Sequence, residues 1–99
     1  MTAESVPAEL LEVREKIDAI DAELLNLLAA RFALTYRVGV LKADKALKAM
    51  DAGREAEKLA DLRALSAQHN LNPDLVAELF TKIMEEVVRN HLQLRSPGT

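Results

Sequence analysis

Apolar residues in the first part of the chain recur at alternating spacings of four and three positions. This spacing is typical of a long helix with one continuous apolar stripe, which we call the heptad seam. No Pro interrupts the repeat, and Gly39 is its only Gly. We therefore predict a first helix from about Pro7 to Lys42. The heptad seam consists of Val13, Ile17, Ile20, Leu24, Leu27, Arg31, Leu34, Val38 and Leu41.

Start and stop signals divide the rest of the chain into two further helices. Asp51, a good N-cap residue, predicts the start of the second helix. That helix is expected to end near Gln68-His69-Asn70, because Asn tolerates the left-handed conformation. Asn72-Pro73-Asp74 predicts the third start, with an N-cap, a Pro in the first turn and an acid behind it. Ser96-Pro97-Gly98 predicts its end.

The third helix has a broad apolar face, and no segment shows a strand pattern. We therefore predict an all-α protein, a three-helix protomer with one very long first helix. Residues 1–99 are expected to form a single domain with a core of about 8–95. The apolar face comprises Leu75, Val76, Leu79, Phe80, Ile83, Met84, Val87, Val88 and Leu92.

The length of the first helix predicts a second copy of the chain. A helix of about 33 residues is roughly 50 Å long, whereas a sphere made from a chain of this size is roughly 33 Å across. The heptad seam of a monomer therefore stays partly in water. An interlocked homodimer with twofold symmetry covers it. The alternative is a helix that breaks near Gly39.

Composition and charge exclude several classes of protein. The chain has 99 residues, no Cys, three aromatic residues and a net charge of −3. A thiolate metal site, a Cys nucleophile and a nucleic-acid binder are therefore not expected. No run of 18 apolar residues predicts a membrane span. Met1-Thr2-Ala3-Glu4 lacks the basic start of a signal peptide, so we expect a cytoplasmic protein.

Charged residues on the predicted apolar faces are the candidates for chemistry. Arg31 lies in the heptad seam, where a guanidinium must reach water, pair with a carboxylate or face a polar cavity. Asp51 and Glu55 are four apart and share one helix face. They are either an N-cap with a solvated acidic turn or two acceptors for a hydroxyl or ammonium. His91 continues an apolar row of the third helix, where a satisfied core histidine is more common than a catalyst.

The spacing of two cations on the first helix restricts what they can bind. Arg14 and Lys42 are 28 residues apart, or about 42 Å along one helix. They cannot touch one small molecule within one chain. In an antiparallel pair of first helices, however, Arg14 of one chain approaches Arg31 and Lys42 of the other. A cavity lined in this way suits a small dianion, since Arg pairs with carboxylates through two bonds.

These residues give the chain a resemblance to the all-helical (AroQ-type) chorismate mutase family, over about Leu10 to Leu94. Six charged positions match that family's pattern in register. The resemblance implies an interlocked dimer with two equivalent sites that rearrange chorismate to prephenate in aromatic amino-acid biosynthesis. It implies no cofactor, no metal and no covalent intermediate. The matching pieces are Leu11-Glu12-Val13-Arg14-Glu15-Lys16-Ile17-Asp18, Asp21 to Leu28 with Ala30-Arg31, Val38-Gly39 with Lys42, and Asp51 with Arg54-Glu55.

The resemblance also implies a role for each matching residue. Arg14 enters from the partner chain and holds one substrate carboxylate, while Arg31 holds a carboxylate from its own chain. Lys42 bonds the enolpyruvyl carboxylate and the ether oxygen. Asp51 and Glu55 fix the ring hydroxyl. Arg54 supports the carboxylate side.

Two positions of the third helix depart from the family pattern. His91 stands where the family usually has a Gln that donates to the ether oxygen, and an imidazole can still donate there. Val87 replaces a Ser that contacts a carboxylate, so this wall becomes apolar. Three alternatives stay open: a mutase acting on 4-amino-4-deoxychorismate, an isochorismate pyruvate lyase, and a helical dimerisation module without activity.

Overall fold

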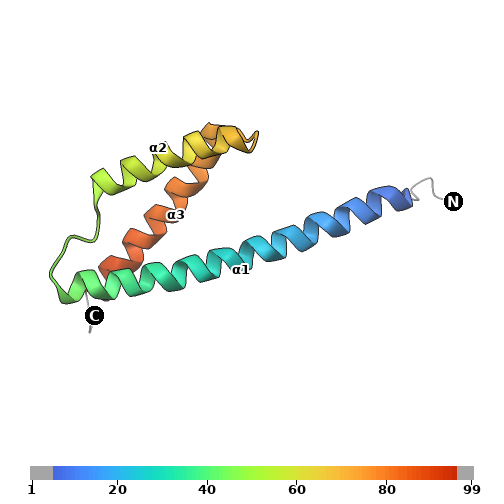
Figure 1. Cartoon of the computed structure of the whole chain (residues 1–99). Helices are drawn as coiled ribbons and strands as arrows, with labels where there is room; N and C mark the ends of the chain where they lie inside the picture. The colour runs from blue at the N-terminus through green and yellow to red at the C-terminus, as the bar shows by residue number, and fades with distance from the viewer. Residues whose placement is uncertain (1–5, 96–99) are drawn as a thin grey trace. The chain divides into compact units, whose positions relative to one another are not determined.

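The structure, a computed structural model, describes residues 6–95 and contains three helices within them. Helix α1 covers Ala8–Asp44, α2 covers Ala52–Gln68 and α3 covers Pro73–Leu94 (Figure 1). No strand occurs in this range. The all-α, three-helix prediction is confirmed. The expectations for Met1-Thr2-Ala3-Glu4 and Ser96-Pro97-Gly98 lie outside the described residues.

Helix α1 continues through Gly39, so the alternative of a helix broken at that residue is wrong. The chain nevertheless divides into two compact units, with the boundary between Ala33 and Leu34. The first unit contains the N-terminal part of α1. The second contains the last turns of α1 together with α2 and α3. The single domain predicted from the sequence stays a prediction.

The heptad seam of α1 lies in water in a single chain. In the first unit, Val13, Ile20 and Leu27 are 48%, 61% and 59% exposed. In the second unit, Leu34 and Leu41 are 59% and 56% exposed. Large apolar side chains in a regular row at this exposure are typical of an interaction surface.

Helix α1 is also long and apolar enough to cross a membrane, judged by length and composition alone. The sequence expectation was that no segment could do so, because no uninterrupted apolar run is long enough. The mean hydropathy of an 18-residue window stays high even when the window contains a charge such as Arg31. The sequence expectation instead required an unbroken apolar run, and the two criteria therefore differ. The seam of a coiled helix pair has the same composition, so composition does not separate the two environments.

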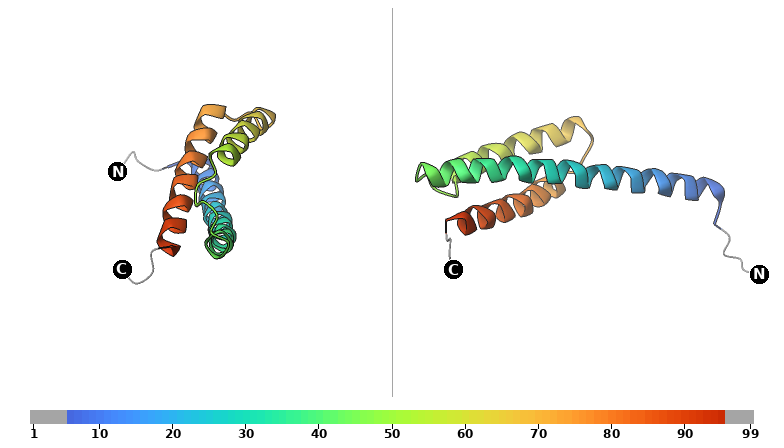
Figure 2. Two further views of the ribbon diagram at one scale, coloured as in Figure 1. Left: turned by 90° about the vertical axis from the view of Figure 1, so that its left-hand side faces the viewer. Right: turned by 90° about the horizontal axis from the view of Figure 1, so that it is seen from below.

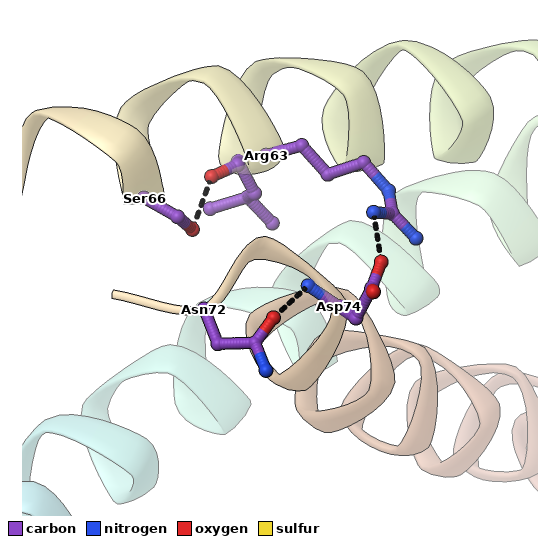
Figure 3. Close-up of polar contacts among 5 residues, drawn as sticks. Arg63, Ser66, Asn72 and Asp74 are labelled. Carbon is purple, nitrogen blue, oxygen red and sulfur yellow. Dashed lines mark hydrogen bonds and ion pairs between the residues drawn. The ribbon is translucent and has the colours of Figure 1, made fainter. Parts of the chain in front are cut away.

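Helices α2 and α3 form a hairpin joined by a short turn (Figures 1 and 2). Figure 3 shows Arg63 of α2 reaching Asp74 in the first turn of α3, with 2.7 Å between Nη1 and Oδ1. In the same view the Ser66 hydroxyl donates to the Leu62 carbonyl at 2.6 Å. The ion pair is exposed and contributes little. The buried contacts between the helices therefore hold the hairpin together.

Two small residues and one methionine are buried in this hairpin. Ala77 and Met84 of α3 are 6% and 8% exposed, and Ser66 of α2 is 3% exposed. The predicted apolar face of α3 is confirmed at Met84, but Leu75 and Leu79 are more than half exposed. Close approach of two helices favours small side chains at the contact, because a larger one would push the backbones apart.

The predicted N-caps of α2 and α3 are confirmed. Asp51 Oδ1 accepts from the Arg54 N–H at 3.0 Å, and Asn72 Oδ1 accepts from the Asp74 N–H at 2.9 Å. Each side chain satisfies a helix donor that has no partner within the helix.

Replacing Asn72 tests the cap of α3. Asn72→Ala should lower the free energy of unfolding by about 1 kcal/mol, because the Asp74 N–H loses its acceptor. Urea unfolding at one fixed protein concentration measures the change. Gln93→Ala, an exposed substitution inside the same helix, is the control and should stay within about 0.5 kcal/mol. Equal effects from the two substitutions would contradict the cap.

Helices α1 and α2 end in the same hydrogen-bonded motif. After α1, the Leu47 N–H donates to the Lys42 carbonyl at 2.7 Å and the Ala46 N–H to the Ala43 carbonyl at 3.2 Å. This pair of bonds is the Schellman motif, whose penultimate residue adopts left-handed backbone angles. That residue is Ala46 in α1, with φ 56°. The motif after α2 has Asn70 there, with φ 57°, as its sequence predicted.

Ala46 is an unusual choice at that position, because its Cβ disfavours the left-handed region. Ala46→Gly should therefore raise the free energy of unfolding by about 1 kcal/mol. Thermal and urea unfolding measure it. The matched control is Ala60→Gly, at an exposed position inside α2, which should lower stability by about 1 kcal/mol. If both substitutions destabilise equally, the strain at Ala46 is absent.

Candidate active site

Lys42 lies in the last turn of α1, and the segment that follows folds back over it. Its side chain is half-buried, and its Nζ donates to the Ala49 carbonyl at 3.4 Å. The Lys42 carbonyl is itself fixed by the Schellman motif. A cation in the last turn of a helix also interacts favourably with the helix dipole. The backbone of Lys42 is therefore fixed by the Schellman motif, and its ammonium lies within reach of one loop carbonyl.

Lys42 and Asp51 line the same hollow, which we call the Lys42 hollow and which measures about 460 Å³. The structure thus brings together two of the residues predicted from the sequence. Lys48 lines it too and was missed, since no spacing rule assigns a lysine in a loop to a particular partner. Two ammonium groups and one carboxylate give the hollow an excess of positive charge. The full lining is Lys42, Leu47, Lys48, Met50, Asp51 and Ala52.

Glu55 lies beside a different hollow, formed by α2 and α3. This second hollow measures about 510 Å³, and Met50 lines both hollows. Glu55 is half-buried there, with Thr81 and Glu85 among its neighbours. Arg54, the next predicted residue, has an exposed side chain. Asp51 and Glu55 thus share a helix face, as predicted, but open onto two hollows that adjoin at Met50.

His91 is buried on α3, with 2% of its surface exposed. Its Nε2 lies 2.8 Å from the Thr35 carbonyl oxygen of α1. Within residues 6–95, Nδ1 has no hydrogen-bond partner, although it is buried. Val87, one turn earlier, is half-buried. Within a single chain, His91 therefore makes the contacts of a core histidine, one of the two interpretations that its sequence position allowed.

Arg14 and Arg31 belong to the first compact unit, whereas the Lys42 hollow belongs to the second. Arg14 is exposed on α1 and Arg31 is half-buried. Neither guanidinium is among the residues that line the Lys42 hollow. No cluster of three or more potential metal ligands occurs among residues 6–95.

Comparison with known proteins identifies the family. The profile of the chorismate mutase type II family matches residues 13–92. The chain is 39% identical over 88 residues to a bifunctional chorismate mutase/prephenate dehydratase of Escherichia coli K12, covering 89% of this chain and 22% of that protein. It is 37% identical over 79 residues to a T-protein of Enterobacter agglomerans, covering 80% of this chain and 21% of that protein.

A third relative is similar in size to this chain. The chorismate mutase of Methanocaldococcus jannaschii is 31% identical over 77 residues, which cover 78% of each protein. The chain belongs to the chorismate mutase type II family. It spans about a fifth of the length of the two longer relatives. The resemblance inferred from the charged residues is confirmed.

Proposed function

We propose that this protein is a chorismate mutase, an isomerase that converts chorismate to prephenate in aromatic amino-acid biosynthesis. One observation carries the proposal: in a chain of this family, Lys42 and Asp51 line one hollow with an excess of positive charge. That hollow suits a small dicarboxylate that also carries a hydroxyl group. We further propose that the enzyme acts in the cytoplasm and needs no cofactor.

The reaction type explains why these residues are sufficient. The rearrangement is a pericyclic [3,3] shift, so it needs neither a nucleophile nor a proton transfer. The enzyme must hold a flexible dianion in a compact conformation, which is work of orientation. As the C–O bond breaks, negative charge grows on the ether oxygen. A fixed cation stabilises that charge more in the transition state than in the ground state.

Lys42 is the proposed source of that stabilisation. Its ammonium lies 3.4 Å from the Ala49 carbonyl oxygen and lines the Lys42 hollow, where it can face charge that develops on a ligand. Asp51 offers its carboxylate to the ring hydroxyl from the start of α2. Glu55 is assigned to the same hydroxyl on family grounds, with Arg54 on the carboxylate side. Val87 adds an apolar wall.

The remaining cations require the proposed homodimer. The exposed heptad seam of α1 supports it, because a second copy lying along the seam removes the apolar row from water. In this arrangement Arg14 is contributed by the partner chain and Arg31 by the chain that also provides Lys42. Each of the two equivalent sites then has a guanidinium for each substrate carboxylate.

The Lys42→Ala variant tests the proposed chemistry. Its kcat with chorismate should fall at least ~100-fold, since one transition-state donor contributes on the order of 3 kcal/mol. Loss of the ring diene absorbance measures turnover, and circular dichroism checks the fold. Lys45→Ala, an exposed lysine outside the hollow, is the control and should retain activity.

The same assay separates the alternatives. Chorismate and 4-amino-4-deoxychorismate are supplied separately to the wild-type protein, and pyruvate release from isochorismate is followed in a third reaction. Faster turnover of the amino analogue would move the assignment to that substrate. Pyruvate release would indicate a lyase, and no turnover of any of the three would leave a dimerisation module. Full activity in Lys42→Ala would refute the role of the lysine.

Mixing two inactive variants tests the shared site. Arg14→Ala and Lys42→Ala homodimers are combined and allowed to exchange chains. The mixture should recover about a quarter of wild-type kcat, because half of the dimers are mixed and each mixed dimer has one intact site. The recovery is followed by the chorismate assay after brief denaturation and refolding together.

A second mixture provides the control. Arg31→Ala and Lys42→Ala alter residues proposed to serve one site from the same chain, so each site of their mixed dimer lacks one group. This mixture should stay inactive. Equal recovery in both mixtures, or recovery in neither, would contradict the proposed contribution of Arg14 across the interface.

A further inference from the structure

The ring of His91 occupies space that exists because residue 39 has no side chain. A Cβ placed on Gly39 would lie 2.8 Å from His91 Nε2 and 2.9 Å from Leu94 Cδ1, and would also collide with His91 Cδ2. Carbon atoms in real structures do not approach so closely. The Gly39 backbone of α1 therefore forms one wall of the pocket that holds the imidazole.

The Thr35 carbonyl determines which ring nitrogen of His91 carries the proton. A carbonyl oxygen can only accept, and it lies 2.8 Å from Nε2, so Nε2 must donate. In the neutral ring, Nδ1 is then the bare nitrogen and can only accept. A neutral His91 held in this way has no N–H left for the ether oxygen of a ligand, which is also an acceptor.

We infer that His91 is a positioning residue, which Gly39 and the Thr35 carbonyl hold as the Nε2-protonated tautomer and which fixes the last turns of α1 against α3. Lys42 follows Gly39 by three residues, close to one helical turn, so the two lie on the same face of α1. The imidazole thus acts through the helix that carries the ammonium. The inference rests on the proposed function only where turnover is measured.

Nitrogen NMR of the full-length protein tests the tautomer without any substrate. In mildly alkaline buffer, where an imidazole is normally neutral, long-range ¹H–¹⁵N spectra should show His91 Nε2 protonated and Nδ1 bare. His69, exposed in the turn after α2, supplies the reference for a ring free to exchange tautomers. A protonated Nδ1 or an equal mixture of tautomers at His91 would overturn the inference.

The same spectra recorded with a bound ligand separate positioning from donation. The probe is an oxabicyclic dicarboxylate that mimics the transition state of the rearrangement. Nδ1 of His91 should stay bare when the mimic binds. Protonation of Nδ1 on binding would show that His91 donates to the ligand, and the positioning role would be refuted.

Gly39→Ala tests the pocket and its effect on Lys42. The added Cβ should displace the ring and restore a mixture of tautomers. It should lower kcat with chorismate on the order of 100-fold through misplacement of the ammonium, with a smaller change in KM. Gly53→Ala is the matched control, because a Cβ there would lie at an ordinary contact distance of 3.7 Å from Asp51 Oδ1. It should leave the His91 signals unchanged.

A double-variant cycle keeps the test valid if Gly39→Ala folds poorly. In a His91→Ala background the ring is gone, so adding the Cβ at residue 39 should lower the unfolding temperature much less than it does in the wild type. Equal losses in the two backgrounds would contradict the contact. If the NMR and the cycle behave as expected while chorismate is not turned over, the proposed function fails and the positioning contact stands.

Discussion

The structure around the candidate site depends on one backbone conformation, the left-handed φ of 56° at Ala46. This residue ends α1 in a Schellman motif, and the motif fixes the carbonyl of Lys42. The chain then passes over the lysine, where the Ala49 carbonyl accepts from Nζ, and reaches Asp51 at the start of α2. If α1 continued for one more turn, none of these groups would meet. The position of the ammonium is therefore set by where a helix stops.

Charged side chains and the N-terminal end of α2 meet at this point. The last turn of α1 presents Lys42, and the first turn of α2 presents backbone N–H groups near Ala52, which also lines the Lys42 hollow. Lys42 and Lys48 and the N-terminal end of a helix all favour an anion. Asp51 supplies the opposite charge, which favours a hydroxyl or ammonium. In the proposed function, these opposite charges would orient a ligand that has both kinds of group.

Local signals predicted much of this arrangement, and tertiary contacts account for the remainder. Asp51, Asn72 and Asn70 have side chains that favour caps or left-handed angles, so both ends of α2 and the start of α3 were predicted. Ala46 has no such preference, and the end of α1 was placed two residues early. Burial of Ala77 depends on how closely α2 and α3 approach, which composition does not encode. The proposed relation of Arg14 to Lys42 joins two chains, so the contacts of one chain do not contain it.

The exposed heptad seam of α1 has a consequence for a newly synthesised chain. If a second copy buries the seam, then a newly synthesised chain completes its structure only when it binds another chain. The concentration of the protein in the cell would then govern both its activity and its resistance to degradation. A monomer would expose to proteases, and to other unfolded chains, the apolar surface that dimerisation buries.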